Sequence, residues 1–107
     1  FERRKGCLVF HFTGQLDAYS EKQFMKYVED VLLANASPVI VDLSKVDFLD
    51  SSGLGALVQI AKQCKKAKRA FALVGNARVV QTVKLVRLEE FLDLVTDLSA
   101  ALNRVNG

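Results

Sequence analysis

Apolar and polar residues alternate in two different periods along the chain, and the first segment has the period of a β-strand. Residues 7–12 place every second side chain on the same face, which is the repeat of an extended strand. We expect this strand to stop at Thr13-Gly14. Lys5-Gly6 before it is typical of a tight turn, so residues 1–4 form a candidate hairpin partner.

The next segment has the three- to four-residue repeat of an amphipathic helix. Ser20 and Gln23 have the spacing of a capping box, and Tyr19 and Phe24 stand at the positions of a hydrophobic staple around it. The helix must end before Pro38, because proline disfavours helical backbone in the residue that precedes it. Its expected apolar face comprises Phe24, Val28, Val31 and Leu32.

After that helix, strands and helices continue to alternate. Residues 39–43 are β-branched and almost wholly apolar, as in a strand covered on both faces. The later predicted elements are, in chain order, a loop over 44–53, a helix over 53–66, a strand over 70–74, a helix capped by Asn76, a strand over 92–95 and a helix capped by Asp97. Such alternation favours an α/β fold with a mostly parallel sheet, because parallel neighbours need crossover connections that helices usually supply.

Composition narrows the picture to one domain that folds by itself. The 107 residues are 50% hydrophobic and 25% charged, close to the average of globular domains and far from that of disordered chains. The longest apolar runs are about five to six residues against roughly twenty for a bilayer span, so we expect no membrane insertion. We interpret 1–107 as a single domain, and Phe1 in place of methionine as a sign of trimming at the N-terminus.

The net charge of +3 comes mainly from five lysine and arginine residues over 62–69. A single-stranded nucleic-acid site would carry aromatic side chains among its cations, and none are interleaved here. The cluster also lies at the carboxyl end of a predicted helix, where cations offset the helix dipole. We therefore interpret it as a solvated face that binds no nucleic acid, with an acidic protein partner left open.

Neither the cysteines nor the acids have the spacing of a metal site. Cys7 and Cys64 are far apart, with no CxxC pattern and no neighbouring histidine, which is typical of small core residues. The acids Asp42, Asp47 and Asp50 also lack a credible ligand spacing. We expect no metal and no cofactor.

Function in open α/β sheets gathers in the loops beyond the carboxyl ends of strands, which selects residues 13–17 and 44–53 here. The second loop places three residues of helix-capping type directly before a helix, namely Asp50, Ser51 and Ser52. One such residue is enough for a cap. Three in a row, followed by Gly53-Leu54-Gly55, exceed that need and favour a functional loop, in which small residues let another molecule approach the backbone.

A phosphoryl group on Ser52 would be compatible with this position. It would sit at a helix amino end, where free amide groups and the helix dipole favour an anion. The modification would add a charge of about −1.5 to −2 beside Asp50 and Asp17. We therefore expect it to change the outer surface far more than the interior.

The sequence lacks the residue patterns that common enzymatic mechanisms require. A nucleophile elbow needs G-x-S-x-G, and the sequence around Ser52 has neither glycine in place. The single histidine, His11, lies in a predicted strand and is expected to be a partly exposed sheet residue rather than a general base. No P-loop and no G-x-G-x-x-G is present. A small hydrolase acting through Ser52 is thus the weakest hypothesis.

Three segments together resemble the STAS domain family, which comprises bacterial anti-sigma factor antagonists and the cytoplasmic tails of sulphate-type anion transporters. They are Phe12-Thr13-Gly14-Gln15-Leu16-Asp17, Val39-Ile40-Val41-Asp42-Leu43 and Phe48-Leu49-Asp50-Ser51-Ser52-Gly53-Leu54-Gly55-Ala56-Leu57. The resemblance implies a four- to five-stranded mixed, mostly parallel sheet with helices mainly on one face.

By the same resemblance, Ser52 matches the serine that a partner anti-sigma factor with serine kinase activity phosphorylates. The unphosphorylated domain would bind that partner, and a serine phosphatase would reset the phosphorylated form. Asp17 matches the loop acid near this serine. The expected switch and partner-binding residues are Asp17, Asp50, Ser51, Gly53, Leu54 and Gly55, with Ser51 also a candidate structural cap.

The family offers two roles for such a domain. The isolated length and the intact serine pair favour a cytoplasmic anti-sigma factor antagonist over a transporter tail. The oligomeric state and the identity of the partner stay open.

Two segments depart from the family pattern. Lys68-Arg69 stands where many relatives have a glycine-containing turn. Residues 86–89, Val-Arg-Leu-Glu, replace the Ser-Gly or Thr-Gly that often ends the third helix. Neither segment touches the serine loop, so we expect them to affect partner specificity rather than the fold.

Overall fold

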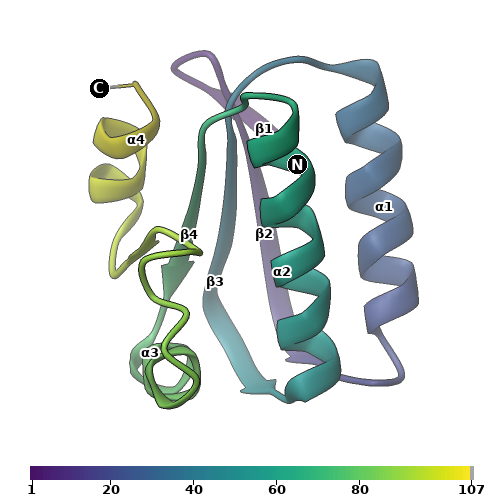
Figure 1. Cartoon of the computed structure of the whole chain (residues 1–107), viewed down its shortest axis with the longest axis vertical. Coiled ribbons are helices and arrows are strands. Elements are labelled where there is room, and N and C mark those ends of the chain that lie inside the picture. The colour runs from purple at the N-terminus through teal and green to yellow at the C-terminus, as the bar shows by residue number, and fades with distance from the viewer. Residues whose placement is uncertain (107) are drawn as a thin grey trace.

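The computed structural model describes residues 1–106 as one mixed sheet with four helices (Figure 1). The strands are β1 (Glu2–Arg4), β2 (Cys7–Leu16), β3 (Val39–Leu49), β4 (Phe71–Gly75) and β5 (Leu94–Val95). The helices are α1 (Glu21–Ala34), α2 (Ser51–Lys66), α3 (Ala77–Leu85) and α4 (Leu98–Asn106). Within the described residues, no helix is long and apolar enough to cross a bilayer.

The sheet has the order β1-β2-β3-β4-β5, with β1 antiparallel and all other neighbours parallel. The expected mostly parallel α/β sheet is therefore confirmed, and so is the hairpin partner at the N-terminus. Lys5 and Gly6 form its turn with φ of 51° and 80°, the left-handed backbone that tight hairpin turns require.

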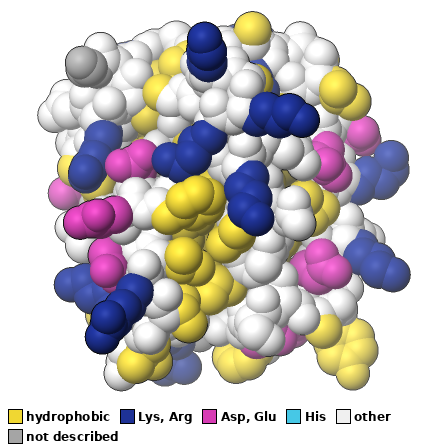
Figure 2. Space-filling view, viewed as in Figure 1, with side chains coloured by type: hydrophobic (Ala, Val, Ile, Leu, Met, Phe, Trp, Pro, Cys, Tyr) yellow, Lys and Arg dark blue, Asp and Glu magenta, His cyan; other side chains and the backbone are white. Residues whose placement is uncertain are grey.

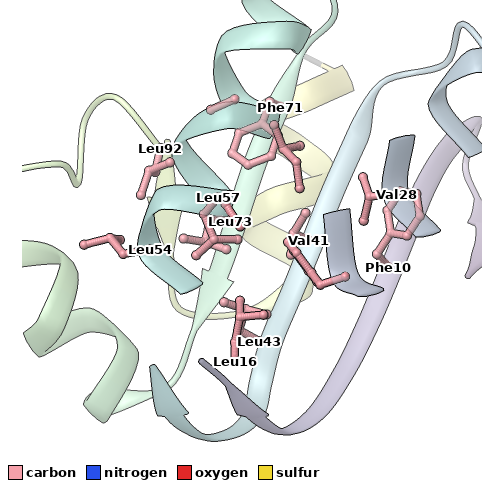
Figure 3. Close-up of a cluster of buried hydrophobic side chains, with 14 of the residues drawn as sticks. Phe10, Leu16, Val28, Val41, Leu43, Leu54, Leu57, Phe71, Leu73 and Leu92 are labelled. Atoms are coloured by element: carbon pink, nitrogen blue, oxygen red, sulfur yellow. The ribbon is translucent and has the colours of Figure 1, made fainter. Parts of the chain in front are cut away.

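The helices cover the two faces of the sheet unequally, as expected. The larger core lies under α1, α2 and α3, where Phe10, Val41 and Leu57 are fully buried (Figure 3). A smaller cluster on the opposite face packs Ile40 against Ala101 of α4. The middle strand β3 is thus covered on both sides, which explains its nearly continuous apolar run.

Two strands are longer than their patterns predict. β2 continues past Thr13-Gly14 to Leu16, and β3 continues to Leu49, so the expected loop over 44–53 is wrong. The reason is that the parallel pairing resumes after register shifts, helped by Gly14 with φ of 83°. These irregularities interrupt the two-residue alternation by which a strand is recognised in sequence.

The start of α1 also differs from expectation. Ser20 makes no cap with its side chain, and Tyr19 is 96% exposed, so the capping box and the staple are both wrong. Instead, the Ser20 hydroxyl donates to the Gln15 carbonyl at 3.1 Å, and the Asp17 carbonyl accepts from the Glu21 amide at 2.9 Å. A short turn centred on Asp17 therefore starts the helix. The expected end before Pro38 is confirmed, at Ala34.

The other caps are confirmed. Asn76 accepts a hydrogen bond from the Val79 amide at 2.9 Å, and Asp97 accepts one from the Ala100 amide at 2.7 Å. The helix expected over 53–66 begins two residues earlier, at Ser51, and β5 is shorter than the expected strand over 92–95.

Candidate functional site

The two loops selected in the sequence lie side by side because their strands are neighbours. Leu16 at the end of β2 is the register partner of Leu49 at the end of β3. The amide of Asp50 donates to the carbonyl of Leu16 at 3.3 Å. The residues after the two strands, Asp17 and Asp50, therefore begin the connections to α1 and α2 at the same edge of the sheet. We call Asp50–Gly55 the switch segment.

Asp50 provides the cap of α2. Its carboxylate oxygen Oδ1 accepts from the Gly53 amide at 3.0 Å, and its carbonyl accepts from the Leu54 amide at 2.9 Å. The question of which residue caps this helix is thus settled in favour of Asp50. Neither serine is needed for that role.

Ser51 and Ser52 are the first two residues of α2. The Ser51 side chain is exposed and Ser52 is half-buried. Within residues 1–106 neither hydroxyl makes a hydrogen bond, and both amides precede the first intrahelical bond at Leu54. Two free hydroxyl groups and two free amides thus meet at the positive end of the helix dipole.

The two glycines of the switch segment have different surroundings. A Cβ on Gly53 would lie 2.3 Å from the backbone oxygen of Leu16, so this glycine lets the helix touch the end of β2. Gly53 therefore accommodates the chain itself rather than another molecule. A Cβ on Gly55 would meet nothing within 4 Å, and this exposed position leaves the backbone of the first turn uncovered.

Leu54 anchors the segment between those glycines. Its side chain is 8% exposed and belongs to the main core, together with Leu16 and Leu57 (Figure 3). The first turn of α2 is therefore held from inside by Leu54 and from its end by Asp50. These two contacts fix the position of the backbone that carries Ser51 and Ser52.

The Asp17 carboxylate is fixed by hydrogen bonds within the turn that leads into α1. Its carboxylate oxygen Oδ1 accepts from the amides of Tyr19 at 3.0 Å and Ser20 at 3.1 Å. The acid that the family resemblance places near Ser52 thus has a structural task at the start of α1, and one oxygen, Oδ2, is left outside these bonds.

A hollow of about 240 Å³ adjoins the site between the last residues of β2 and the first half of α1. Its lining comprises Phe12, Thr13, Gln15, Leu16, Ser20, Gln23, Phe24, Tyr27 and Val46. Beside it, Phe48 at the end of β3 is 45% exposed. The sequence predicted neither feature, because residues 44–49 were expected to form a loop, and the orientation of Phe48 depends on the strand register.

His11 is far from the serines along the sheet. Its ring nitrogens Nδ1 and Nε2 lie 2.7 Å from carboxylate oxygens of Asp42 and Glu2, respectively. Asp42 comes eight positions before Asp50 in the sequence, which is about 25 Å along a strand at roughly 3.3 Å per residue. The structure therefore does not bring the histidine to Ser52 as a general base. Its expected place as a partly exposed sheet residue is confirmed.

Both cysteines are buried, as expected. Burial raises the pKa of the Cys64 thiol despite the nearby Arg69, and it also raises the pKa of the Cys7 thiol. Thiols of this kind are poor nucleophiles because little thiolate forms near neutral pH. The described residues also contain no group of three or more His, Cys, Asp or Glu side chains that could hold a metal ion.

The described residues form an α/β domain with a serine pair at the amino end of α2, and a comparison with known families identifies the family. The sequence profile of the STAS domain matches residues 1–101. The chain belongs to the STAS domain family, and the resemblance seen in the sequence is confirmed.

Several relatives are close in length to this chain. A Thermotoga neapolitana homolog of the protein TM1081 is 30% identical over 95 residues, 87% of this chain and 84% of that protein. RsfB of Mycobacterium tuberculosis, an anti-sigma-F factor antagonist, is 26% identical over 103 residues, 95% of this chain and 84% of RsfB. The crystal structure of an anti-sigma factor antagonist from Mycobacterium paratuberculosis superposes with a TM-score of 0.87 at 26% identity, covering 99% of this chain and 91% of that one.

The fold also occurs inside a transporter. The murine anion transporter Slc26a9 superposes with a TM-score of 0.81 at 18% identity, covering 98% of this chain and 18% of the transporter. At that identity the likeness shows the fold alone.

Proposed function

We propose that this chain is a phosphorylation-regulated antagonist of an anti-sigma factor. Its unphosphorylated form binds an anti-sigma factor with serine kinase activity, which keeps that factor from its sigma factor. Phosphorylation of Ser52 by the bound partner releases the chain, and a serine phosphatase restores the binding form. The same account makes the domain a binding module of the cytoplasm rather than an enzyme.

One observation carries this proposal: the helix cap is complete without the serines. Asp50 already holds the Gly53 amide at 3.0 Å, so the hydroxyl of Ser52 is available for chemistry. The free amides of the first turn can receive the phosphoryl oxygens within the chain. Family resemblance selects Ser52 over the more exposed Ser51.

The physical effect of one phosphoryl group is large enough for a switch. It brings a charge of about −1.5 to −2 to a surface that already contains Asp50 and Asp17. Weakening the partner's binding a hundredfold requires about 2.7 kcal/mol. Burying a charged phosphate at an interface without full pairing would cost at least about that much.

The site assignment is tested by incubating the chain with its cognate anti-sigma kinase and ATP and locating the phosphate by mass spectrometry. We expect full modification of the wild type and of Ser51→Ala, and none of Ser52→Ala. Full modification of Ser52→Ala would overturn the site. Failure of the kinase to modify any variant, despite a native circular dichroism spectrum, would overturn the proposed function.

The STAS domain family offers a second candidate, the cytoplasmic regulatory domain of a sulphate-type anion transporter. This role would need transmembrane segments in the full gene product. Sequencing the complete reading frame distinguishes the two, because ten or more membrane spans upstream of Phe1 would favour the transporter. The intact serine pair makes us prefer the antagonist.

A further inference from the structure

We infer that the end of the molecule opposite the switch segment is a docking surface for an acidic protein segment. Six cationic side chains there, which we call the basic pole, make no ion pair within residues 1–106: Arg3, Lys5, Lys65, Lys66, Lys68 and Arg69. The six cations lie in residues 3–6 and 65–70, and neither these segments nor the neighbouring residues 33–38 contain aspartate or glutamate. This surface lies apart from the phosphorylation site, so the inference does not rest on the proposed switch.

The topology gathers these segments at one end. β2, β3 and β4 all begin there, and α1 and α2 both end there (Figure 1). Hydrogen bonds join the segments, because Asn35 after α1 accepts from both Arg3 and Arg69 through its side-chain and main-chain oxygens. Figure 2 shows lysine and arginine side chains over the upper part of the face, where α2 ends.

Helix-dipole compensation explains only part of this charge. α1, α2 and α4 end at the pole, and each helix end carries about −0.5 charge, roughly −1.5 in total. Arg69 already satisfies the end of α1 by donating to the carbonyls of Leu32 and Asn35. Lys65 lies over the ring of Phe91, 5.0 Å from its centroid, and the other lysines exceed what the helix ends require.

Two of the cations occupy positions where glycine would be less strained. Lys5 and Lys68 have φ of 51° and 56°, and left-handed backbone costs an ordinary L-residue roughly 1 kcal/mol. Glycine would avoid that cost in both turns. Lysine at both positions adds positive charge to the pole despite the strain, which favours a role for the side chains.

A hollow of about 240 Å³ lies beside these cations, between the ends of α1 and α2. Its lining comprises Glu29, Leu32, Leu33, Gln63, Ala67 and Arg69. Leu33 is 87% exposed, and the carboxylate of Glu29 is bound to the Gln63 amide at 2.8 Å. The hollow can therefore receive an apolar side chain whose neighbouring carboxylates reach the lysines.

This combination fits a peptide better than other polyanions. A nucleic-acid duplex offers phosphates but no aliphatic side chain to fill the hollow beside Leu33. A bilayer surface would accept the protruding Leu33, but it has no side chain of its own to fill the hollow beside that residue. A protein segment that alternates glutamate or aspartate with leucine supplies both charge and an apolar anchor.

The test uses a fluorescein-labelled synthetic peptide of glutamates with interspersed leucines, titrated into the isotopically labelled chain. We expect NMR shifts confined to residues 3–6, 33–36 and 65–69, and an affinity that falls with added salt. Lys66→Glu/Lys68→Glu should weaken binding about tenfold or more, equivalent to about 1.4 kcal/mol. The matched control Lys22→Glu/Lys84→Glu changes the net charge equally on exposed helix positions and should leave binding unchanged.

Three results would overturn the inference. They are the absence of shifts at the pole, equal weakening by the control pair, and tighter binding of duplex DNA or phosphatidylserine vesicles than of the peptide. Leu33→Ser tests the hollow separately, and an unchanged affinity would exclude an apolar anchor there. Amide spectra of the free variants show whether each remains folded.

Discussion

At the scale of single residues, the junction between Leu16 and Gly53 fixes where the switch segment sits. The helix start touches the strand end so closely that any side chain at position 53 would meet the Leu16 carbonyl at 2.3 Å. Glycine is thus required by contact within the chain, and its φ is not unusual.

We predict that Gly53→Ala lowers the free energy of unfolding by about 3 kcal/mol, because the backbone of β2 or α2 must move to admit the methyl group. Gly55→Ala is the matched control, since its Cβ would meet nothing within 4 Å. That variant should be more stable by roughly 0.5–1 kcal/mol, because alanine is the better helix former. Urea denaturation measures both, and equal effects would refute the contact argument.

Lys68 and Arg87 occupy positions that favour glycine. Each has positive φ, at 56° and 59°, and each is the second residue after its helix. At both helix ends, two backbone amides beyond the helix donate to carbonyls of its last turn. After α2 these bonds run from Lys68 to the Lys65 carbonyl and from Arg69 to the Cys64 carbonyl, which is the Schellman arrangement. Many relatives have glycine at the two segments where this chain departs from the family pattern, 68–69 and 86–89. The left-handed backbone at Lys68 and Arg87 explains that preference.

Lys68→Gly and Arg87→Gly should each raise the free energy of unfolding by about 0.5–1 kcal/mol, since glycine relieves the left-handed strain. Lys66→Gly, inside the last turn of α2, should lower it by a similar amount. Thermal unfolding of the three variants checks the signs, and destabilisation by both position-68 and position-87 glycines would contradict the assignment of strain.

At the scale of secondary-structure elements, the stability of the α2 start depends on one carboxylate. Asp50→Ala should destabilise the protein by about 1 kcal/mol, because the Gly53 amide loses its partner. Ser51→Ala and Ser52→Ala should stay within about 0.5 kcal/mol of the wild type, as exposed or unbonded side chains do. Chemical denaturation distinguishes these outcomes, and a large loss in either serine variant would show that a serine shares the cap.

The first three strands are also tied by a polar cluster around His11. Burial raises the pKa of Asp42, but the amide and hydroxyl of Ser44 and the ring of His11 outweigh it and lower the pKa overall. A lowered folded-state pKa stabilises the protein at pH values above the ordinary aspartate pKa, near 4. That contribution is lost as the pH falls through the lowered pKa.

Asp42→Asn should therefore be less stable than the wild type by about 1 kcal/mol at pH 7, where the carboxylate accepts its hydrogen bonds. The difference should shrink as the pH falls below about 4 and the wild-type carboxyl is protonated. Urea denaturation at several pH values measures this. A constant difference across that range would show that charge at Asp42 plays no part.

The order and type of the elements could be predicted because helix and strand periods differ clearly over most of the chain. The ends of β2 and β3 could not, since register shifts near Gly14 interrupt the alternation. The turn at Asp17 was likewise missed, because its carboxylate bonds depend on a strand continuing to Leu16. Local signals worked where one side chain caps one helix, as at Asn76.

At the scale of the whole molecule, the two ends of the parallel strands differ in charge. The end with the switch segment carries Asp17, Glu21, Asp47 and Asp50 together with the two exposed cations Lys22 and Lys45, and the other end carries the basic pole. Phosphorylation would make the first end still more negative and leave the second unchanged. The domain could thus exchange one partner at its switch end while another stays bound at the pole.

The candidate site could be located from the sequence because its key residues are contiguous in the chain. Three consecutive residues of helix-capping type marked the place, and family resemblance selected Ser52. The exposed Phe48 and the hollow beside Gln15 could not be foreseen, since they depend on which faces of β2 and β3 meet α1. Contacts between distant segments, rather than local patterns, determine those features.

The most direct measurement of the proposed function is the affinity of the chain for its cognate anti-sigma factor, by isothermal titration calorimetry, with and without phosphate on Ser52. We predict tight binding of the unphosphorylated wild type and of Ser51→Ala, and a loss of at least about a hundredfold, or 2.7 kcal/mol, on phosphorylation of Ser52. Equal affinities of the two forms, or no binding by the unphosphorylated form, would contradict the account.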